Sequence, residues 1–336
     1  MDRKKKIVVI GGGTGTYSVL SGLKRYSDSV DITAVVAMSD NGSSTGRLRD
    51  EFGVLPVGDV RMALLALSDE ERIDHHTLRS LLTYRFTKGE GLAGHNLGNL
   101  LLVALSDILG GEKDAIESLS RLLGLRGKVL PVTTDHISLV ARYDDGSEVV
   151  GESSIDEPPH DRGERIIESL SVTPSAVLGE GVREAITEAD CIVLGPGDLY
   201  TSLLAAVVVG DVSSCIQKAR GSFVFIGNLM SKFGQTTGFD SAKYVAEIGK
   251  YVGRFPDAIY INTESLPPAA LARYTAIGEH PVPDAGSGRD ETRVVRGDFL
   301  AKEMIRNASG ETIKRSLVRH DGAKLAALLI ESESRL

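Results

Sequence analysis

The sequence predicts an α/β fold in which a doubly wound, mostly parallel β-sheet lies between two layers of helices. Short β-branched runs alternate with segments of helical periodicity, the pattern of parallel strands joined by crossover helices. Glycine or a polar turn follows each run, which is typical of buried strands that end at a sheet edge. The predicted strands are Ile7–Ile10, Ile32–Ala37, Cys191–Leu194, Phe223–Ile226 and Ala258–Ile261.

Seven segments carry apolar residues at three- and four-residue spacing and are predicted to be helices that cover both faces of the sheet. They are Tyr17–Arg25, Val60–Leu67, His76–Tyr84, Asn96–Leu109, Asp114–Leu123, Arg183–Ala189 and Ala242–Val252. A last helix is predicted over Gly322–Ile330, after a Pro-, Gly- and Asp-rich connection at Glu279–Glu291.

The segment 128–175 is predicted to be an insertion that contains a small antiparallel β-hairpin. Ser138–Tyr143 and Ser147–Glu152 are strand-like, and the turn sequence Asp144-Asp145-Gly146 lies between them. All 336 residues are expected to form a single α/β domain, with a C-terminal extension over 262–336 that packs on the core.

Composition argues against several classes of protein. Acidic side chains outnumber basic ones by 46 to 38, and the net charge of -8 repels polyanions, so nucleic acid is not an expected partner. Only Cys191 and Cys215 are present, which fits a reducing cytoplasm rather than a disulfide framework or a zinc site. The best apolar run, Leu203–Val209, is far shorter than the ~20 residues that cross a bilayer, so no membrane insertion is expected.

The first glycine-rich loop follows the first strand and opens the first helix. Its backbone N–H groups and the helix N-terminus favour phosphate, although such a loop can also serve only to pack the helix against the strand. The loop is no regular dinucleotide fingerprint, because Thr16 or Ser18 stands where the third glycine belongs, and no P-loop lysine follows. The candidate phosphate-binding residues are Gly11, Gly12, Gly13, Thr14 and Gly15.

A polar loop over 39–47 follows the second strand and combines a carboxylate, an amide, hydroxyls and a guanidinium. Asp40 suits Mg²⁺ or a ribose hydroxyl, and Arg47 suits phosphate, although Asp-Asn-Gly is also an ordinary turn. Asp59 begins a later helix and is either its cap or a second functional carboxylate. Asp40 and Asp59 are therefore the candidates for Mg²⁺ and for catalysis, and the binding candidates in this loop are Asn41, Ser44, Thr45 and Arg47.

Three further segments contribute candidate ligand-binding residues. His95 and Asn99 lie four residues apart at the start of an apolar helix, where they are either structural or bind a base, sugar or phosphate. Gly195-Pro196-Gly197 follows a buried strand and leads into a helix rich in hydroxyl donors, which repeats the pattern of the first loop. The candidates are His95, Asn96, Asn99, Gly195, Pro196, Gly197, Tyr200, Thr201, Asn228 and Met230.

Taken in order, these motifs resemble the YvcK/CofD family, which contains bacterial gluconeogenesis factors and 2-phospho-L-lactate transferases. The resemblance runs from Gly11–Gly15 through Gly195–Ser202 to Arg319-His320-Asp321 and so covers nearly the whole chain. It implies a Rossmann-like three-layer fold, often dimeric, with a nucleotide-diphosphate site on these loops. In the transferase branch the site holds a guanosine diphosphate group and Mg²⁺, whereas the gluconeogenesis-factor branch is linked to UDP-sugars, cell shape and wall synthesis.

This chain departs from the family pattern at three places. Asn41 stands where the transferase branch has a second acidic residue, which removes a carboxylate from the implied metal site. Asp198 replaces the usual serine, and its charge repels a phosphate unless the side chain caps the helix or binds metal. Lys232-Phe233-Gly234-Gln235-Thr236 stands where the pattern reads Gln-Pro-Gly-Glu-Thr.

These observations leave three functional hypotheses in order. The first is a regulatory protein of the gluconeogenesis-factor type that binds UDP-N-acetylglucosamine or UDP-glucose and acts as a homodimer. The second is a Mg²⁺-dependent phospho-group transferase that uses a nucleotide diphosphate substrate and in which Asp40 and Asp59 hold the metal. The third is a NAD-dependent oxidoreductase, for which no acid–base residue stands out beside the irregular glycine loop.

Overall fold

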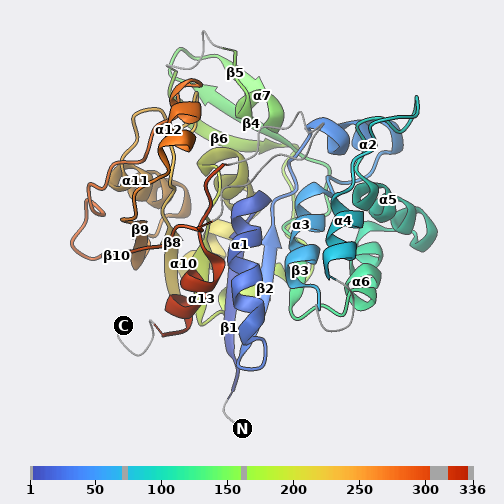
Figure 1. Ribbon diagram of the computed structural model, residues 1–336, viewed down its shortest axis with the longest axis horizontal. Helices are drawn as coiled ribbons and strands as arrows, with labels where there is room; N and C mark the ends of the chain where they lie inside the picture. The colour runs from blue at the N-terminus through green and yellow to red at the C-terminus, as the bar shows by residue number, and fades with distance from the viewer. Residues whose placement is uncertain (1–2, 70–74, 160–164, 303–316, 332–336) are drawn as a thin grey trace.

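The centre of the protein is a seven-stranded sheet in which every neighbouring pair of strands is parallel (Figure 1). The computed structural model describes residues 3–69, 75–159, 165–302 and 317–331. The strand order is β10-β9-β8-β7-β1-β2-β3. The strands are β1 (Lys5–Gly11), β2 (Val30–Val36), β3 (Lys128–Pro131), β7 (Cys191–Leu194), β8 (Ser222–Ile226), β9 (Ala258–Asn262) and β10 (Arg293–Gly297). All five strands predicted from the sequence are confirmed.

Helices form a layer on each face of the sheet, which confirms the doubly wound α/β class. The chain starts in the middle at β1, moves outward to β2 and β3, and then returns to β7 beside β1 before moving outward the other way. Because crossovers are right-handed, this reversal puts the helices of the two halves on opposite faces. One layer has α1 (Gly13–Leu23), α3 (Gly58–Leu67) and α13 (Gly322–Glu331), and the other has α8 (Val182–Thr187), α10 (Val212–Lys218) and α11 (Ser241–Val252).

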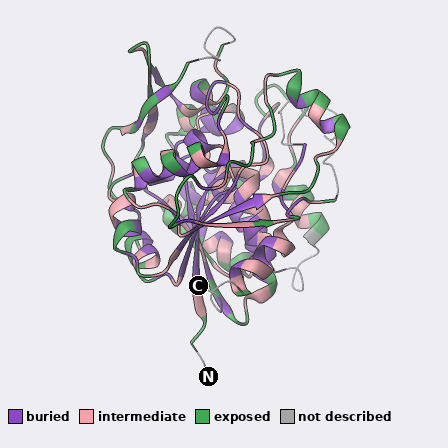
Figure 2. Ribbon diagram, turned by 90° about the vertical axis from the view of Figure 1, so that its left-hand side faces the viewer, coloured by how far each residue is buried: buried purple, intermediate pink, exposed green. Residues whose placement is uncertain are grey.

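The core lies between the sheet and these two layers. Residues 7–10 of β1 and all of β7 are apolar and buried on both faces, as strands of parallel sheets usually are. Figure 2 shows the buried strands at the centre of the molecule and the exposed residues on the outer helices and loops. Burial of these β-branched side chains stabilises the sheet by about 1.5–3 kcal/mol for each large apolar residue.

A small antiparallel sheet lies over one end of the main sheet (Figure 1). Its order is β5-β4-β6, made by β4 (Ser138–Tyr143), β5 (Glu148–Val150) and β6 (Ile167–Thr173). The hairpin predicted around residues 144–146 is confirmed, but Glu152 begins the short helix α7 (Glu152–Asp156) instead of ending a strand. Residues 128–131 of the segment predicted as an insertion form β3 of the main sheet.

The remaining helices flank the sheet and its loops. Residues 43–47 of the polar loop expected over 39–47 instead begin α2 (residues 43–52), which is followed by Gly53 in a left-handed conformation with φ +64°. The bounds of α2 are Ser43–Phe52. The other helices are α4 (His75–Thr83), α5 (Leu97–Leu109), α6 (Glu112–Leu122), α9 (Ala205–Val207) and α12 (Pro268–Thr275). There is also a 3₁₀ turn η1 (Lys24–Tyr26) and a π-helical turn η3 (Leu199–Leu204). Over the described ranges no single helix is long and apolar enough to cross a membrane, and one bent pair, Leu199–Val207 with Val212–Lys218, meets that test by length and composition alone.

Candidate functional site

Two glycine-rich loops meet where the order of the strands reverses. β1 and β7 are neighbours in the sheet, and the carboxyl ends of such neighbours border the crevice in which doubly wound proteins bind ligands. A Cβ atom on Gly15, in the first loop, would lie 2.1 Å from the carbonyl oxygen of Pro196 in the second. The two loops therefore touch, and only glycine at position 15 allows this contact.

A cleft with a volume of about 660 Å³ lies at these loops. Its walls come from both halves of the sheet, from α7 beside the small sheet, and from the segment just before α13. The predicted site residues that line it are Gly12, Gly13, Thr14, Gly15, Asp40, Ser44, Thr45, Asp59, Asn96, Asn99, Pro196, Gly197, Thr201, Asn228 and Met230. Segments that are as much as 308 residues apart in the chain, at Gly12 and His320, thus form one cleft.

Some predicted residues support the lining of the cleft from behind. The Nδ1 atom of His95 lies 3.3 Å from the Ser44 hydroxyl oxygen, which also accepts a 3.1 Å hydrogen bond from the backbone N–H of Asn96. Arg47 donates to the carbonyl oxygen of Ala93 at 3.1 Å. These contacts join the start of α5 to α2, so His95 and Arg47 fix the positions of lining residues and do not line the cleft themselves.

Four other predicted residues also lie outside the lining. The Oδ1 atom of Asn41 accepts a 2.8 Å hydrogen bond from the backbone N–H of Ser153 and so caps α7. The Tyr200 hydroxyl donates to a carboxylate oxygen of Glu247 at 3.0 Å within the core. Gly11 and Gly195 are buried in the turns that carry the two glycine loops.

Asp59 lies against the first glycine loop, and the Asp40 carboxylate lies beside Gly58, the residue before Asp59. A Cβ atom on Gly12 would lie 2.0 Å from a carboxylate oxygen of Asp59, and the same carboxylate accepts a hydrogen bond from the backbone of Gly13. Burial, together with the charge of Asp40, raises the pKa of Asp59 to about 7, against the opposing effects of the hydrogen bond from Gly13 and the charge of Arg61. Burial also raises the pKa of Asp40, against the bonds from Gly42 and Thr45, which lower it.

Five more carboxylates that sequence reasoning did not assign to a binding site line the cleft. Glu152 and Asp156 lie on α7, Glu157 follows it, Asp198 follows Gly197 directly, and Glu279 lies after α12. Burial raises the pKa of Glu152, and the charges of Asp40 and Asp156 raise it further. The Asp198 side chain does not cap η3. Its carboxylate instead pairs with the ammonium group of Lys232 at 3.7 Å.

Basic and imidazole side chains form the rest of the polar lining. Arg61 donates to the Asn99 side-chain oxygen at 2.8 Å and to the carbonyl oxygen of Leu82 at 2.8 Å, which ties α3 to α4 and α5. His320 is buried, its Nε2 atom has no hydrogen-bond partner, and burial lowers its pKa to about 4. The basic and imidazole lining residues are Arg61, Arg79, Arg85, Lys232, Arg319 and His320. Arg61, Lys232, Arg319 and His320 had a signal in the sequence, as parts of motifs compared with the family pattern, but none of them was assigned to the site.

The residues present fit a phosphate-bound magnesium ion better than a dedicated metal cage. In the described part of the chain, no three His, Cys, Asp or Glu side chains converge as metal ligands. Mg²⁺ commonly binds through one or two carboxylates together with waters and substrate phosphates. Asp40 and Asp59 beside a glycine loop match that donor set.

Known proteins match this architecture along nearly its whole length. A family model described as 2-phospho-L-lactate transferase CofD matches residues 7–300. The gluconeogenesis factor of Bacillus subtilis is 37% identical over 334 residues, which cover 98% of this chain and 99% of that protein. The gluconeogenesis factor of Halalkalibacterium halodurans is 35% identical over 343 residues, covering 99% of this chain and 98% of that one.

A crystal structure of a Bacillus halodurans protein has the same fold. Its TM-score against this chain is 0.87 at 34% sequence identity, and the match covers 98% of this chain and 100% of that one. The family match begins within β1 and ends after β10, so it covers residues 7–11 of β1, the other six strands of the main sheet and both glycine loops. On the fold, the loops and these matches together, the chain belongs to the CofD family and is similar throughout to its gluconeogenesis factors.

Proposed function

We propose that this chain is a regulatory protein of the gluconeogenesis-factor type that binds a UDP-sugar, with UDP-N-acetylglucosamine or UDP-glucose as the favoured ligand. The observation that carries the proposal is the contact between the Gly12–Gly15 and Gly195–Gly197 loops at the reversal of the strand order. The similarity to gluconeogenesis factors supports a role in carbon flow on gluconeogenic carbon sources. A UDP-sugar ligand would connect that role to cell shape and cell-wall synthesis.

In this proposal the diphosphate lies on the two glycine loops. The backbone N–H groups at the N-terminus of α1 donate to its oxygens, and the positive end of the helix dipole favours its charge. Asp40 and Asp59 would hold Mg²⁺, which neutralises part of the diphosphate charge when it is bound. The volume of about 660 Å³ is within the range of small-molecule sites and leaves room for a sugar beyond the phosphates.

Thermal unfolding with a panel of nucleotides tests the ligand class. At about 100 times its dissociation constant, a ligand that binds only the folded state stabilises by ~2.7 kcal/mol, enough to rank UDP-sugars against GDP and NAD. We expect UDP-N-acetylglucosamine or UDP-glucose to give the largest shift, with tighter binding than GDP and NAD by competition calorimetry. If GDP or NAD ranks first, the UDP-sugar assignment fails. Light scattering on the same samples tests the proposed homodimer.

A Mg²⁺-dependent transferase is the second candidate, and the Asp59 carboxyl group favours it. A carboxyl group with a pKa of about 7 in a cleft has the properties of a general base or acid at neutral pH. We expect chromatography after prolonged incubation with Mg²⁺ and UDP-sugar to return the ligand unchanged. Release of UDP or UMP at a rate abolished by Asp59→Asn would establish the transferase instead.

A further inference from the structure

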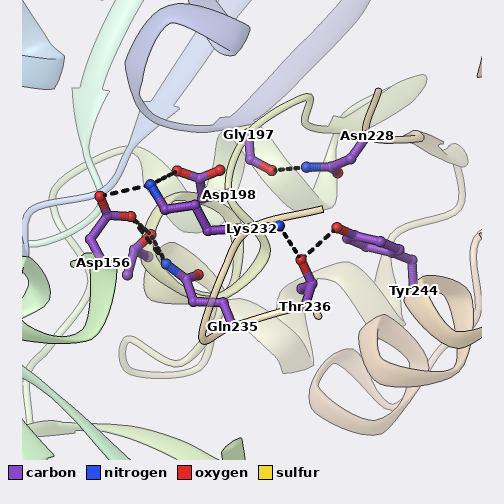
Figure 3. Close-up of polar contacts among 9 residues, drawn as sticks. Asp156, Gly197, Asp198, Asn228, Lys232, Gln235, Thr236 and Tyr244 are labelled. Carbon is purple, nitrogen blue, oxygen red and sulfur yellow. Dashed lines mark hydrogen bonds and ion pairs between the residues drawn. The ribbon is translucent and has the colours of Figure 1, made fainter. Parts of the chain in front are cut away.

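Two of the sequence departures from the family pattern meet in the cleft. The ammonium group of Lys232 lies 3.1 Å from a carboxylate oxygen of Asp156 and 3.7 Å from one of Asp198 (Figure 3). Asp198 directly follows the second glycine loop, and Lys232 lies beyond β8. Relative to the family pattern, the added negative charge of Asp198 is therefore paired with the added positive charge of Lys232.

Lys232 is held at its backbone, so its side chain approaches the cleft from a fixed base. Its backbone N–H donates to the Thr236 hydroxyl oxygen at 2.9 Å, and that oxygen also accepts a 2.9 Å hydrogen bond from the Tyr244 hydroxyl. The carbonyl oxygen of Lys232 accepts from the backbone N–H groups of Gln235 and Thr236 in a tight turn. Figure 3 shows the Lys232 side chain extending from this turn toward the carboxylates of Asp156 and Asp198.

Asp156 is anchored more fully than Asp198. Its Oδ1 atom accepts from the Thr201 hydroxyl at 3.1 Å and from the Gln235 side chain at 3.0 Å, while its Oδ2 atom accepts from Lys232. The Asp198 side chain is 40% exposed, against 23% for Asp156 and Lys232. Asp198 is therefore the partner that an incoming anion can displace, whereas Asp156 keeps the ammonium group in place.

The loop that carries Asp198 is fixed by a hydrogen bond from Asn228. The Asn228 side chain donates to the carbonyl oxygen of Gly197 at 2.8 Å, which orients the peptide next to Asp198. Seven carboxyl groups line the cleft, and their ionised forms repel a diphosphate: Asp40, Asp59, Glu152, Asp156, Glu157, Asp198 and Glu279. Although burial lowers the pKa of Lys232, Asp198 and Asp156 raise it more, and the net shift is upward, so the ammonium group stays charged.

We propose that Lys232 is a ligand-binding, specificity-determining residue whose ammonium group neutralises Asp156 and Asp198 and contacts the ligand phosphate on the Gly195–Gly197 loop. This inference rests on the proposed function, because it assigns a residue to the diphosphate of the same ligand. On binding, the phosphate takes the place of Asp198 beside the ammonium group. Asp198 thus occupies Lys232 in the free protein and weakens binding, which restricts the cleft to ligands with enough phosphate charge to compete.

A double-substitution cycle tests this assignment, with calorimetry of UDP-N-acetylglucosamine and of inorganic pyrophosphate as probes. Lys232→Gln should weaken both by about 10- to 100-fold, since a charge-assisted hydrogen bond is lost and two carboxylates are left uncompensated. Asp198→Ser should tighten both by about 3- to 10-fold, because it removes the competing anion. The double variant should return to within about fivefold of the wild type. Lys232→Arg should retain most of the affinity.

The controls separate a binding role from a structural one. Lys113→Gln breaks a surface ion pair of 2.6 Å with Glu180 outside the cleft and should leave both affinities unchanged. Thermal unfolding of every variant shows whether it is folded, and a purely structural pair would lower both stability and affinity in both single variants. If the wild type binds and Lys232→Gln binds equally well, or if Asp198→Ser weakens binding, this inference fails alone. If the wild type binds neither probe, the proposed function fails with it.

Discussion

The Asp59 carboxyl group lies against the first glycine loop, so its protonation state changes the charge at this loop. Its pKa of about 7 lies above the value of 3.8 for a free side chain, so the folded protein holds this proton more tightly than the unfolded chain does. The resulting stabilisation is present in full below pH 4 and is lost as the pH rises to 7. Asp59 therefore makes the folded state less stable at neutral pH, which is a cost commonly seen at functional sites.

We expect Asp59→Asn to remove this pH dependence. The difference in unfolding free energy, variant minus wild type, should increase by on the order of 1–3 kcal/mol between pH 5 and pH 8. Urea unfolding at both pH values measures the difference. Parallel pH profiles for the two proteins would mean that Asp59 titrates normally in the folded state.

Loss of the Asp59 proton should change diphosphate affinity in opposite directions with and without Mg²⁺. Without Mg²⁺, diphosphate affinity should fall as the pH rises from 6 to 8, because the ionised Asp59 repels the ligand. With Mg²⁺, diphosphate affinity should rise over the same pH range, since the metal prefers the ionised carboxylate. Calorimetry in both conditions checks the signs. Asp40→Asn and Asp59→Asn should each reduce the Mg²⁺-dependent part, and if neither does, both residues have only structural roles.

Gly13 offers a test of the phosphate loop that leaves the fold largely intact. Nothing lies within 4 Å of a Cβ atom at this position, but the backbone has φ +68°. Gly13→Val should therefore cost about 1–2 kcal/mol of stability from left-handed strain and abolish ligand binding, because the side chain enters the space above the N–H donors. Gly53→Val is a matched control, since Gly53 has φ +64° and equally open surroundings outside the cleft. Equal affinities of the two variants would contradict the assignment of this loop.

Helix α7 connects the small sheet to the cleft, and Asn41 holds its first turn. Because the Asn41 oxygen accepts from the Ser153 N–H, an aspartate at this position would make the same cap rather than a metal ligand. Having Asn41 in place of an acidic residue therefore weakens the proposed metal site less than the sequence suggested. α7 brings Glu152 and Asp156 to the site instead.

Asn41→Ala should destabilise the protein by about 1 kcal/mol through loss of this cap, while Asn41→Asp should be neutral. Chemical unfolding compares the three proteins. The Mg²⁺ dependence of ligand binding should be the same in Asn41→Asp and the wild type. A stronger dependence in Asn41→Asp would show that the side chain turns toward the metal.

The sequence predicts the elements whose own residues determine them. Central strands are apolar runs because both faces are buried, and the hairpin follows from its turn. β3 is missed because it has four residues and ends in proline, and β10 because its edge position allows Arg293 and Arg296 among the apolar residues. α2 is polar and glycine-containing, and it is stabilised by Leu48 packing against Val103 of α5, a contact that no local pattern encodes.

In the candidate site, too, the sequence predicts what local pattern determines and misses what depends on tertiary contacts. Strand-end loops were found because parallel topology brings them together wherever the strands lie. Asp156 and Lys232 were not assigned to the site, because they meet only after α7 folds over the cleft from the small sheet. Tyr200 was assigned from its place near a glycine loop, but the π-helical turn directs its side chain into the core.

At the scale of the whole molecule, the beginning and the end of the described chain pack together. A Cβ atom on Gly322 of α13 would lie 2.0 Å from the carbonyl oxygen of Ser18, and one on Gly22 of α1 would lie 1.9 Å from the carbonyl oxygen of Gly322. The two helices are therefore in backbone contact. This contact positions residues 318–320, which line the cleft just before α13 begins.

We expect Gly322→Ala to force α13 away from α1 and to cost about 1–3 kcal/mol of stability. Ligand affinity should fall with it, because Arg319 and His320 shift with the helix. Gly91→Ala, at a position with nothing within 4 Å, is the matched control and should change neither quantity. Unaltered affinity in a folded Gly322→Ala protein would show that the segment before α13 is not needed for binding.

The packing of α13 on α1 also has a consequence for biosynthesis. The ribosome makes Gly12 about 300 residues before His320, yet both line the same cleft. A nascent or prematurely terminated chain can form most of the parallel sheet and still lack one wall of the cleft. In the proposed function, therefore, a chain completes its ligand site only once it has been translated past residue 320.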